Sequence, residues 1–505
     1  MKQIMLAFWK ENSIILFFMI GSAISISIIS FINADIVNAL TSRNQSIFFT
    51  SALKLVICYT FFLLFTYLKM RQVSATTQSM ATHLRVQTTK KLVYSGYQNF
   101  AKHSTGTYAS WLTNDISQIE QLGFAPFYEL VAGLITSFIA LGSLFFFHWS
   151  LVVLTLFEVV CLLQIPRLYK KAIAKKTHHV TKQNELFLEK ATDFFNGFSV
   201  LYSLNKQEFI LKKIMSYSTS LGQAKNNYVK TMANVAITGG IGNVLGQVSM
   251  FILTGFLILI QKIALGSIAA TGSLSANIFN TVGNISQFMS SINGTKPLFE
   301  KLAAIPECDT HPYTTSTPMH SGIVLNNLRY QYDSKVVLED ITFSFELNKK
   351  YAIVGASGTG KSTLLNIITG KFLNYTGSVM LNQHEIAAIQ YEEITNQITY
   401  IDQHTHLFNT SVRENLTLDD SFSDEQLWAV LELVDLKEFV AQLPEQLDTN
   451  VGERANLISG GQAQRIGLAR GLIREKHILI IDEGTSSLDQ KNLLMIEKYL
   501  VTKKN

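Results

Sequence analysis

Eight residues in the second half of the chain have the spacing of a phosphate-binding loop. Gly355 to Ser362 follows the pattern G-x-x-x-x-G-K-S, between an apolar stretch that predicts a strand and one that predicts a helix. Glycines let backbone N–H groups curve around phosphate oxygens, and the helix start adds its dipole. We expect Lys361 to reach the β- and γ-phosphates and the Ser362 hydroxyl to ligate Mg²⁺. The candidate nucleotide-binding residues of this loop are Gly355, Ala356, Ser357, Gly358, Thr359, Gly360, Lys361, Ser362 and Thr363.

Two adjacent carboxylates follow the apolar run ILII near the end of the chain. Asp482 is suited to hold Mg²⁺, directly or through water, and Glu483 to polarise an attacking water. Alone, the pair would indicate a strand that reaches the surface. With the phosphate loop upstream, it predicts ATP hydrolysis, with ATP and Mg²⁺ as cofactors and Glu483 and Lys361 as catalytic candidates.

These residues need a scaffold, and the composition indicates that part of it lies in lipid. The chain has 505 residues, 48% hydrophobic and 16% charged, so we expect at least two domains. Three cysteines, Cys58, Cys161 and Cys308, fit neither a disulfide nor a metal spacing. No cleavable signal is evident, and the first apolar run is interpreted as a membrane span. Six membrane helices are predicted, at 14–40, 47–70, 127–147, 150–167, 235–261 and 265–290.

The basic residues divide unevenly among the connections between these spans. The long connections after the second and fourth spans are rich in Lys and Arg, whereas the short links offer only Arg43 and Lys262. The positive-inside rule therefore puts the N-terminus and both long connections in the cytoplasm. Because the net charge of +5 lies beside apolar runs, it does not indicate nucleic acid as a partner. Apolar residues at helical spacing predict that the spans continue as helices into these connections.

Several polar residues fall within the predicted spans, where lipid makes them costly. Glu158, which carries a charge, is the most costly of them in lipid. We expect it to face a cavity or to bond a neighbouring helix, and a cation-binding role is the alternative. The milder cases are Asn243, Gln247, Asn277, Asn280 and Asn284.

The composition changes near residue 306, where Pro, Thr, Ser and His replace the apolar run. We predict a transmembrane domain of six helices at 1–305, a linker at 306–322 and an ATP-binding cassette at 323–505. The expected fold is a helical membrane domain with long cytoplasmic extensions, followed by an α/β P-loop ATPase domain.

Almost the whole chain resembles an ATP-binding cassette exporter half-transporter. The stretch LISGGQAQRIGLAR resembles the signature motif of that family, with Ile458 where leucine is usual. The resemblance implies that Ser459, Gly460, Gly461 and Gln462 belong to the nucleotide site, the first three contacting the γ-phosphate of ATP held by the other subunit. A serine and glycines at a helix start suit an anion.

Other residues match the family in order. The resemblance implies that Tyr332 stacks on adenine, although an ordinary strand tyrosine is the alternative. It also implies that Gln403 senses Mg²⁺ and takes part in catalysis. Glu453 matches the segment that exporters place before the signature, and Asp489 ends a segment that communicates between the two sites. The stretches LTNDISQIE and FFNGFSVLYSLNKQE resemble cytoplasmic loops that transmit cassette closure.

The family resemblance implies a dimer, homomeric or heteromeric, that exports a substrate by alternating access. The substrate is expected to be hydrophobic or amphipathic, and the location a multi-pass protein of the bacterial plasma membrane with its ATPase domain in the cytoplasm. Because the first span starts near the N-terminus, a peptide-processing exporter with a leading protease domain is not expected. The alternative is an ATP-binding, non-hydrolysing or regulatory subunit that completes a partner's nucleotide site.

The end of the chain departs from the family pattern. In the family a further strand follows, and then a histidine that contacts the γ-phosphate, but no histidine follows His477. A missing central strand would leave backbone groups unpaired, at about 1–3 kcal/mol each. The resemblance therefore implies an α/β P-loop ATPase cassette that lacks its last strand or strands. We interpret the chain as a truncated exporter, because every upstream motif is intact; a natural short chain is the alternative.

Overall fold

A computed structural model of the chain contains two compact units. The structure describes residues 1–306, 320–332, 335–356, 358–403, 405–451 and 458–482. The first unit comprises Met1–Lys91 and His103–Ile305, and the second comprises Leu92–Lys102 and Pro306–Asn505. The second unit thus takes in a short piece of chain from the connection between the second and third predicted spans.

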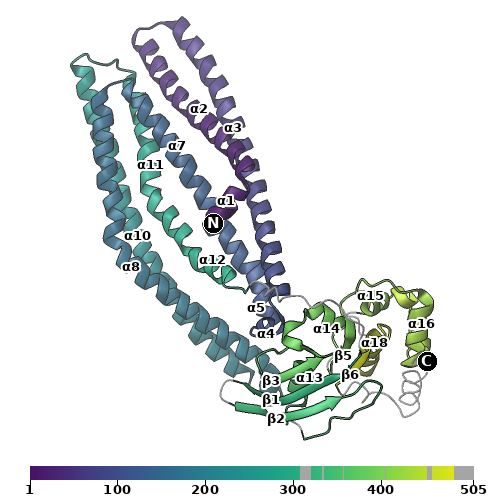
Figure 1. Cartoon of the computed structure of the whole chain (residues 1–505). Coiled ribbons are helices and arrows are strands. Elements are labelled where there is room, and N and C mark those ends of the chain that lie inside the picture. Colours follow the sequence, from purple (N-terminus) through teal and green to yellow (C-terminus); the bar gives the residue numbers. More distant parts are fainter. Residues whose placement is uncertain (307–319, 333–334, 357, 404, 452–457, 483–505) are drawn as a thin grey trace. The chain divides into compact units, whose positions relative to one another are not determined.

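Six long helices build the first unit and fall on the six predicted spans (Figure 1). Three run far beyond their apolar stretches, to 50, 48 and 53 residues, which confirms that the spans continue as helices into the connections. The helices are α2 (Trp9–Thr41), α3 (Gln45–Tyr94), α7 (Ala125–Phe145), α8 (Trp149–Asn196), α10 (Gln207–Leu259) and α11 (Ser267–Gly294).

Four helical stretches of the described residues are long and apolar enough to cross a membrane. They are α2, α3, α10 and the run Thr105–Phe145, which ends in α7; α8 carries the shorter apolar stretch Trp149–Gln164. The sixth predicted span, α11, is more polar because it contains several serines and asparagines, and it is not one of these four stretches. Its buried face, which includes Leu274, Ile278 and Phe279, packs with residues of α7, α8 and α10 in one apolar core.

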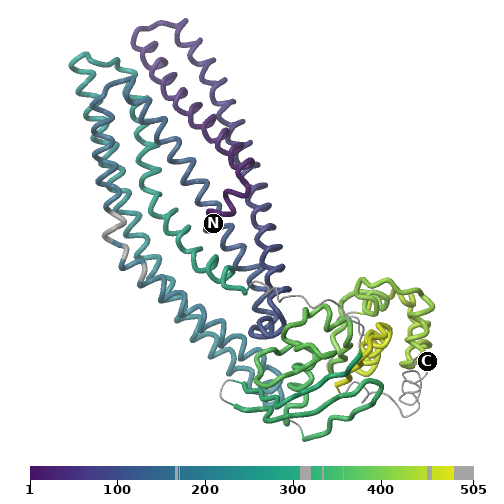
Figure 2. Tube along the Cα trace, in the orientation of Figure 1, coloured from purple at the N-terminus to yellow at the C-terminus, as the bar shows by residue number. Residues whose placement is uncertain are grey.

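Short helices join these elements. Figure 2 traces the chain through these short helices. Two π-helical segments, η1 and η2, overlap the stretch LTNDISQIE, and α9 lies between the end of α8 and the start of α10. The joining elements are α1 (Lys2–Ala7), α4 (Tyr97–Phe100), α5 (Thr105–Ser110), η1 (Trp111–Asp115), α6 (Ile116–Gln118), η2 (Ile119–Phe124), α9 (Phe198–Ser203) and α12 (Lys296–Ala303).

Two sheets form the strand part of the second unit. The first has the order β2-β1-β3-β4, and all its pairs are antiparallel. The second pairs β5 with β6 in parallel. Helix α13 shares one apolar core with β1, β2, β3 and β5. The elements are β1 (Ile323–Tyr332), β2 (Lys335–Phe345), α13 (Lys361–Ile368), β3 (Thr376–Leu381), β4 (His384–Glu385), η3 (Ile386–Ala388), α14 (Tyr391–Gln397), β5 (Ile398–Ile401) and β6 (Ile478–Ile481).

The predicted strand before the phosphate loop is not formed. Residues 351–356 are irregular, and Val354 keeps 88% of its surface exposed. A strand exists only where a neighbouring strand accepts and donates its backbone hydrogen bonds. Within the described part of the chain, β5 and β6 pair with each other, and neither pairs with this segment. Its sequence is strand-like, but it has no described partner strand.

A helical part of the second unit carries the signature residues. Buried side chains of α15, α16, α17 and α18 form a second apolar core, which also holds Ile401 at the end of β5. This core fixes α18 relative to the β5–β6 pair. The elements are α15 (Val412–Thr417), α16 (Asp424–Leu433), α17 (Lys437–Ala441), η4 (Gln446–Asp448) and α18 (Gly460–Leu472).

Candidate nucleotide site

The phosphate loop is closed by its own lysine. Lys361 Nζ donates to the carbonyl oxygens of Gly355 (2.8 Å) and Ala356 (3.0 Å), so the ammonium lies inside the loop. Gly360, which precedes α13, has φ +93°, and a Cβ there would come within 2.8 Å of Leu338. Only glycine fits this conformation and this contact. In the described part of the loop, Lys361 thus bonds two carbonyl oxygens, which phosphate oxygens could replace.

The first turn of α13 meets the end of β6 at the loop. Ser362 Oγ donates to Asp482 Oδ2 at 3.0 Å. Asp482 is 8% exposed, and its N–H donates to the Ile401 carbonyl at 3.0 Å, which continues the β5–β6 ladder by one residue. The structure thus brings together two of the three residues that the sequence assigned to the metal, Ser362 and Asp482.

Tyr400 is a third partner that sequence reasoning missed. Its hydroxyl donates to Asp482 Oδ2 at 3.1 Å. In the register Tyr400 pairs with Ile480 and Ile401 with Ile481, so β5 and β6 end at one edge. Gln403 follows β5 at this edge and is exposed. No local motif marks Tyr400, because its partner lies 82 residues away.

The oxygen atoms at this edge fit Mg²⁺. The ion takes hard oxygen ligands, usually one or two carboxylates together with substrate phosphates and water. Asp482 and Ser362 supply a carboxylate and a hydroxyl in direct contact. Among the described residues no group of three His, Cys, Asp or Glu forms a protein-only metal site, and Mg²⁺ with a nucleotide does not need one.

The signature serine caps the helix that follows it. Ser459 Oγ accepts from the Gln462 N–H at 3.3 Å, and Gln462 Oε1 accepts from the Ser459 N–H at 2.8 Å, which completes a capping box. Since Ser459 Oγ accepts in this pair, its own O–H remains able to donate to a phosphate. Gly460 and Gly461 are exposed in the first turn of α18.

Tyr332 ends β1 with 46% of its surface exposed. Its ring packs edge-on against Tyr330 (5.1 Å between centroids) and Phe372 (6.2 Å). Two aromatic neighbours hold the ring while part of it stays open, which is compatible with stacking on a base.

Some predicted site residues lie outside the described residues. These are Ser357, Glu483, Glu453 and Asp489. Among the described candidates, hydrogen bonds join Ser362 and Tyr400 to Asp482.

Polar residues of the membrane unit form hydrogen bonds within and across helices. Ser249 Oγ on α10 donates to Glu158 Oε1 on α8. Gln247 donates to Asn243 Oδ1, and Asn243 donates to Asn280 Oδ1 on α11, both at 2.8 Å. The bond from Ser249 agrees with the interhelical hydrogen bonding that the sequence analysis expects of Glu158.

A phosphate loop with a buried carboxylate, joined to six long helices, defines a membrane-embedded nucleotide-binding protein. The model of the ABC transporter transmembrane region matches residues 13–282, and that of the ABC transporter matches residues 338–486. The chain belongs to the ABC transporter family and is a multi-pass membrane protein with an ATP-binding domain of the transport ATPases.

Curated relatives are similar over most of the chain. It is 27% identical to an ATP-dependent lipid A-core flippase of Pseudomonas fluorescens, over 83% of this chain and 70% of that protein. It is also 27% identical to a multidrug resistance ABC transporter ATP-binding and permease protein of Lactococcus lactis, over 84% of this chain and 73% of that protein. These relatives place it among ATP-driven exporters.

A solved structure supports the fold. The chain resembles that of a bacterial Atm1-family ABC exporter with ATP bound, with a TM-score of 0.85 and 18% identity, over 99% of this chain and 89% of the other. Together with the two family models and the curated relatives, this likeness of fold confirms the exporter half-transporter interpretation of the sequence.

Proposed function

We propose that this chain binds Mg·ATP at the loop of Gly355–Thr363 and, as half of a dimer, uses ATP hydrolysis to export a hydrophobic or amphipathic substrate. The observation that carries the proposal is the contact of Ser362 with Asp482 at the edge where β5 and β6 end. In this proposal Lys361 binds phosphate oxygens, Ser362 and Asp482 hold Mg²⁺ with Gln403 beside them, and Glu483 activates the water.

Mg²⁺ supplies charge neutralisation at the β- and γ-phosphates when it is bound. The chain's own residues do the rest: Lys361 leaves the Gly355 and Ala356 carbonyls for phosphate oxygens, and Tyr400 holds the Asp482 carboxylate in place. Tyr332 stacks on adenine, while Ser459, Gly460, Gly461 and Gln462 bind the γ-phosphate held by the partner cassette.

The proposed domains are 1–305, 306–322 and 323–505, with the N-terminus and the cassette in the cytoplasm and the spans in the plasma membrane. The excess of Lys and Arg in the long connections supports this orientation. Accessibility of single cysteines on either side of the membrane tests it. A cysteine at Arg43 should react from outside and one at Lys91 from inside.

Substrate class is inferred from the relatives, since one is named for lipid A-core and another for multidrug resistance. Both names refer to amphipathic or apolar cargo. Transport of a fluorescent phospholipid and of an amphipathic dye into proteoliposomes tests this part, with ATP withheld as the control.

The deciding experiment measures Mg·ATP hydrolysis by the purified, reconstituted chain beside a Glu483→Gln variant. We expect turnover that depends on Glu483, with ATP binding retained in the variant. ATP binding without turnover in the unaltered chain would favour the regulatory subunit that completes a partner's site. Loss of both, in a folded chain, would contradict the proposal.

A further inference from the structure

The continuation of α8 beyond its apolar stretch is rich in basic residues and lacks acidic ones. The apolar stretch ends at Gln164, and between Glu158 and Glu185 the sequence contains no Asp or Glu. The neighbouring helix α10 contains none after Glu208 (Figure 1). The basic residues of this part of α8 are Arg167, Lys170, Lys171, Lys175, Lys176 and Lys182, with His178 and His179 among them.

One side of α8 carries four of these side chains. They are separated by four, three and four residues, the spacing that places side chains on one face of an α-helix. All four are exposed, and they are Lys171, Lys175, His178 and Lys182. Lys176 lies half-buried beside them. This face of α8 is therefore positively charged through its lysines.

Helix α10 adds a lysine at the same level. The hydroxyls of Tyr169 on α8 and Thr238 on α10 form a hydrogen bond at 3.1 Å, which sets the register of the two helices. About two turns from this bond along each helix lie Lys176 and Lys230, and Lys230 is exposed. We define Lys171, Lys175, Lys176 and Lys230 as the basic surface of the membrane unit.

The ion pairs that the structure describes on α8 and α10 lie at the other end of these helices. Lys190 pairs with Glu189 at 2.9 Å, and Lys212 with Glu208 at 3.8 Å. Neither pair includes a residue of the basic surface. Because α8 has no acid between Glu158 and Glu185, and α10 none after Glu208, these two helices do not supply its countercharge.

The basic surface begins close to the end of a predicted span. This span ends at residue 167, so Lys171 and Lys175 lie about 6 and 12 Å further along the helix. A headgroup layer is about 5–7 Å thick, and a lysine stem lets its ammonium reach toward it. The field of an anionic leaflet extends about 8 Å further at physiological salt. Both lysines are therefore within reach of lipid headgroups, whereas Lys182, at about 22 Å, lies beyond them.

We propose that the basic surface binds the headgroups of anionic phospholipids in the cytoplasmic leaflet. Four or more lysines directly beside a span attract such lipids, because each ammonium gains from the negative leaflet. A headgroup phosphate that contacts both α8 and α10 also holds the two helices together at the membrane surface. The inference rests on the proposed orientation, which puts this end of the spans in the cytoplasm, and it does not depend on the nucleotide site.

Acetylation of lysines in the full-length chain tests the proposal. The chain is placed in nanodiscs of phosphatidylcholine alone, or of phosphatidylcholine with about one third phosphatidylglycerol. A neutral reagent, N-hydroxysuccinimidyl acetate, then modifies lysines, and mass spectrometry reads each position. We expect Lys171, Lys175 and Lys230 to react about five-fold more slowly with phosphatidylglycerol present. At about 1 M salt, where the screening length is about 3 Å, this difference should largely disappear.

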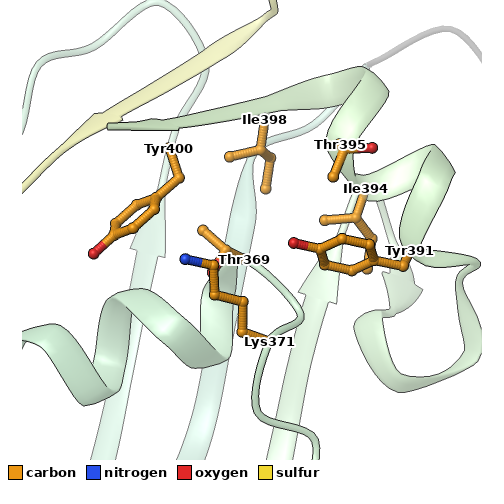
Figure 3. A pocket seen from close by; sticks show the side chains of 7 residues that line it. All are labelled: Thr369, Lys371, Tyr391, Ile394, Thr395, Ile398 and Tyr400. Atoms are coloured by element: carbon orange, nitrogen blue, oxygen red, sulfur yellow. The ribbon is translucent and has the colours of Figure 1, made fainter. Parts of the chain in front are cut away.

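Three lysines of the same chain are internal controls. Lys212 is exposed near the far end of α10 and should react equally in both lipids. Lys69 lies at the end of another predicted span with Arg71 as its basic neighbour, and should slow by less than about two-fold. Lys371 in the second unit lies beside a cavity with its ammonium end toward Tyr400 (Figure 3). It is 4.0 Å from that ring and should react slowly in both lipids.

A variant without the basic surface gives a second measurement. Phosphatidylglycerol should raise the Tm of the unaltered chain by about 2–4 °C, because a lipid that binds the folded state stabilises it. The variant should lose this response while keeping its Tm in phosphatidylcholine, which shows that it folds. It combines Lys171→Gln, Lys175→Gln, Lys176→Gln and Lys230→Gln.

The matched control removes four lysines from the other end of the same helices and should keep the response. It combines Lys190→Gln, Lys206→Gln, Lys212→Gln and Lys213→Gln. Equal acetylation rates in both lipids, or equal slowing at Lys69 and Lys212, would overturn the proposal. Slow acetylation of the basic surface in phosphatidylcholine would mean that a second copy of the chain covers it. Protection by a DNA oligonucleotide without protection by phosphatidylglycerol would identify a soluble polyanion instead.

The outcome for lipid binding is separable from that for ATP hydrolysis. Hydrolysis that depends on Glu483, with acetylation rates unaffected by phosphatidylglycerol, would refute lipid binding alone. Slower acetylation of the basic surface in a chain that neither binds nor hydrolyses ATP would refute the proposed nucleotide site alone.

Discussion

Ser362 and Asp482 are 120 residues apart in the sequence and 3.0 Å apart in the structure. The serine opens α13, and the aspartate follows β6, so the contact joins the phosphate loop to the parallel β5–β6 pair. The aspartate oxygen that accepts from Ser362 also accepts from Tyr400. A hydroxyl and a carboxylate held in this way are ready to share a metal ion.

Ser362→Ala should weaken the use of Mg²⁺ in hydrolysis. The variant loses the metal-facing hydroxyl and its bond to a charged group, worth about 1.5–3 kcal/mol. We expect the apparent Mg²⁺ affinity, measured from the metal dependence of ATPase rate, to fall roughly ten- to hundred-fold. Ser344→Ala, at an exposed position of β2, is the control. An unchanged metal dependence would remove Ser362 from the metal site.

Asn415→Ala should destabilise the helical part of the second unit. Asn415 is fully buried, its amide donates to the Phe408 and Ser411 carbonyls at 2.9 and 3.0 Å, and its Oδ1 accepts from Arg470 on α18 at 3.1 Å. Removing the amide leaves these buried groups unpaired, at about 1–3 kcal/mol. Thermal unfolding of the reconstituted chain measures the effect as a lower Tm.

The exposed Asn396→Ala is the control for that change and should shift the free energy of unfolding by less than about 0.5 kcal/mol. Equal Tm values for the two variants would mean that the Asn415 network does not hold α18. Because α18 carries the capped Ser459, a confirmed loss of stability would also predict weaker binding of the partner's nucleotide.

The site could be predicted in part because its residues form local patterns. The spacing from Gly355 to Ser362 and the apolar run before Asp482 are each readable within a few residues, and apolar length marks the spans. Tyr400 carries no such signal, since its hydroxyl contacts Asp482, which lies 82 residues away in the sequence. The prediction of a strand before the loop was wrong for the same reason. A strand depends on partner strands that the local sequence does not contain.

Lys371 should make stability depend on pH in the alkaline range. Burial lowers its folded-state pKa below the ordinary value of 10.5. Between the two values the unfolded chain binds more protons than the folded chain, so the free energy of unfolding rises with pH across this window. Below the folded pKa the cost of burying the charge is present in full.

Lys371→Met should therefore be more stable relative to the unaltered chain at neutral pH than near pH 10. Tm values measured from pH 7 to about pH 10 give the difference. Lys335→Met, at an exposed position of β2, controls for the loss of a lysine as such. A Tm difference that stays constant with pH would show that the Lys371 charge is not penalised by burial.

Glu158→Gln should leave folding and transport close to those of the unaltered chain. Glu158 is the one acidic or basic side chain between Trp149 and Gln164, and the sequence of α10 from Thr231 to Leu259 contains no charged residue to pair with it. Its Oε1 accepts from Ser249, and a glutamine oxygen can accept the same bond. Interhelical hydrogen bonds of this kind are worth about 0.6 kcal/mol in membranes.

Glu158→Leu is the informative partner of this variant, because it removes the acceptor and leaves Ser249 without Glu158. It should lower stability by about 0.6 kcal/mol, whereas Glu158→Gln should not. The test compares Tm and the transport of a cationic and a neutral amphipathic dye in proteoliposomes. If Glu158→Gln abolished transport of the cationic dye alone, the carboxylate charge would contact the substrate, and the hydrogen-bonding role would be wrong. The contact between α8 and α10 predicts that both dyes move equally in the glutamine variant, since the bond to Ser249 needs an oxygen and not a charge.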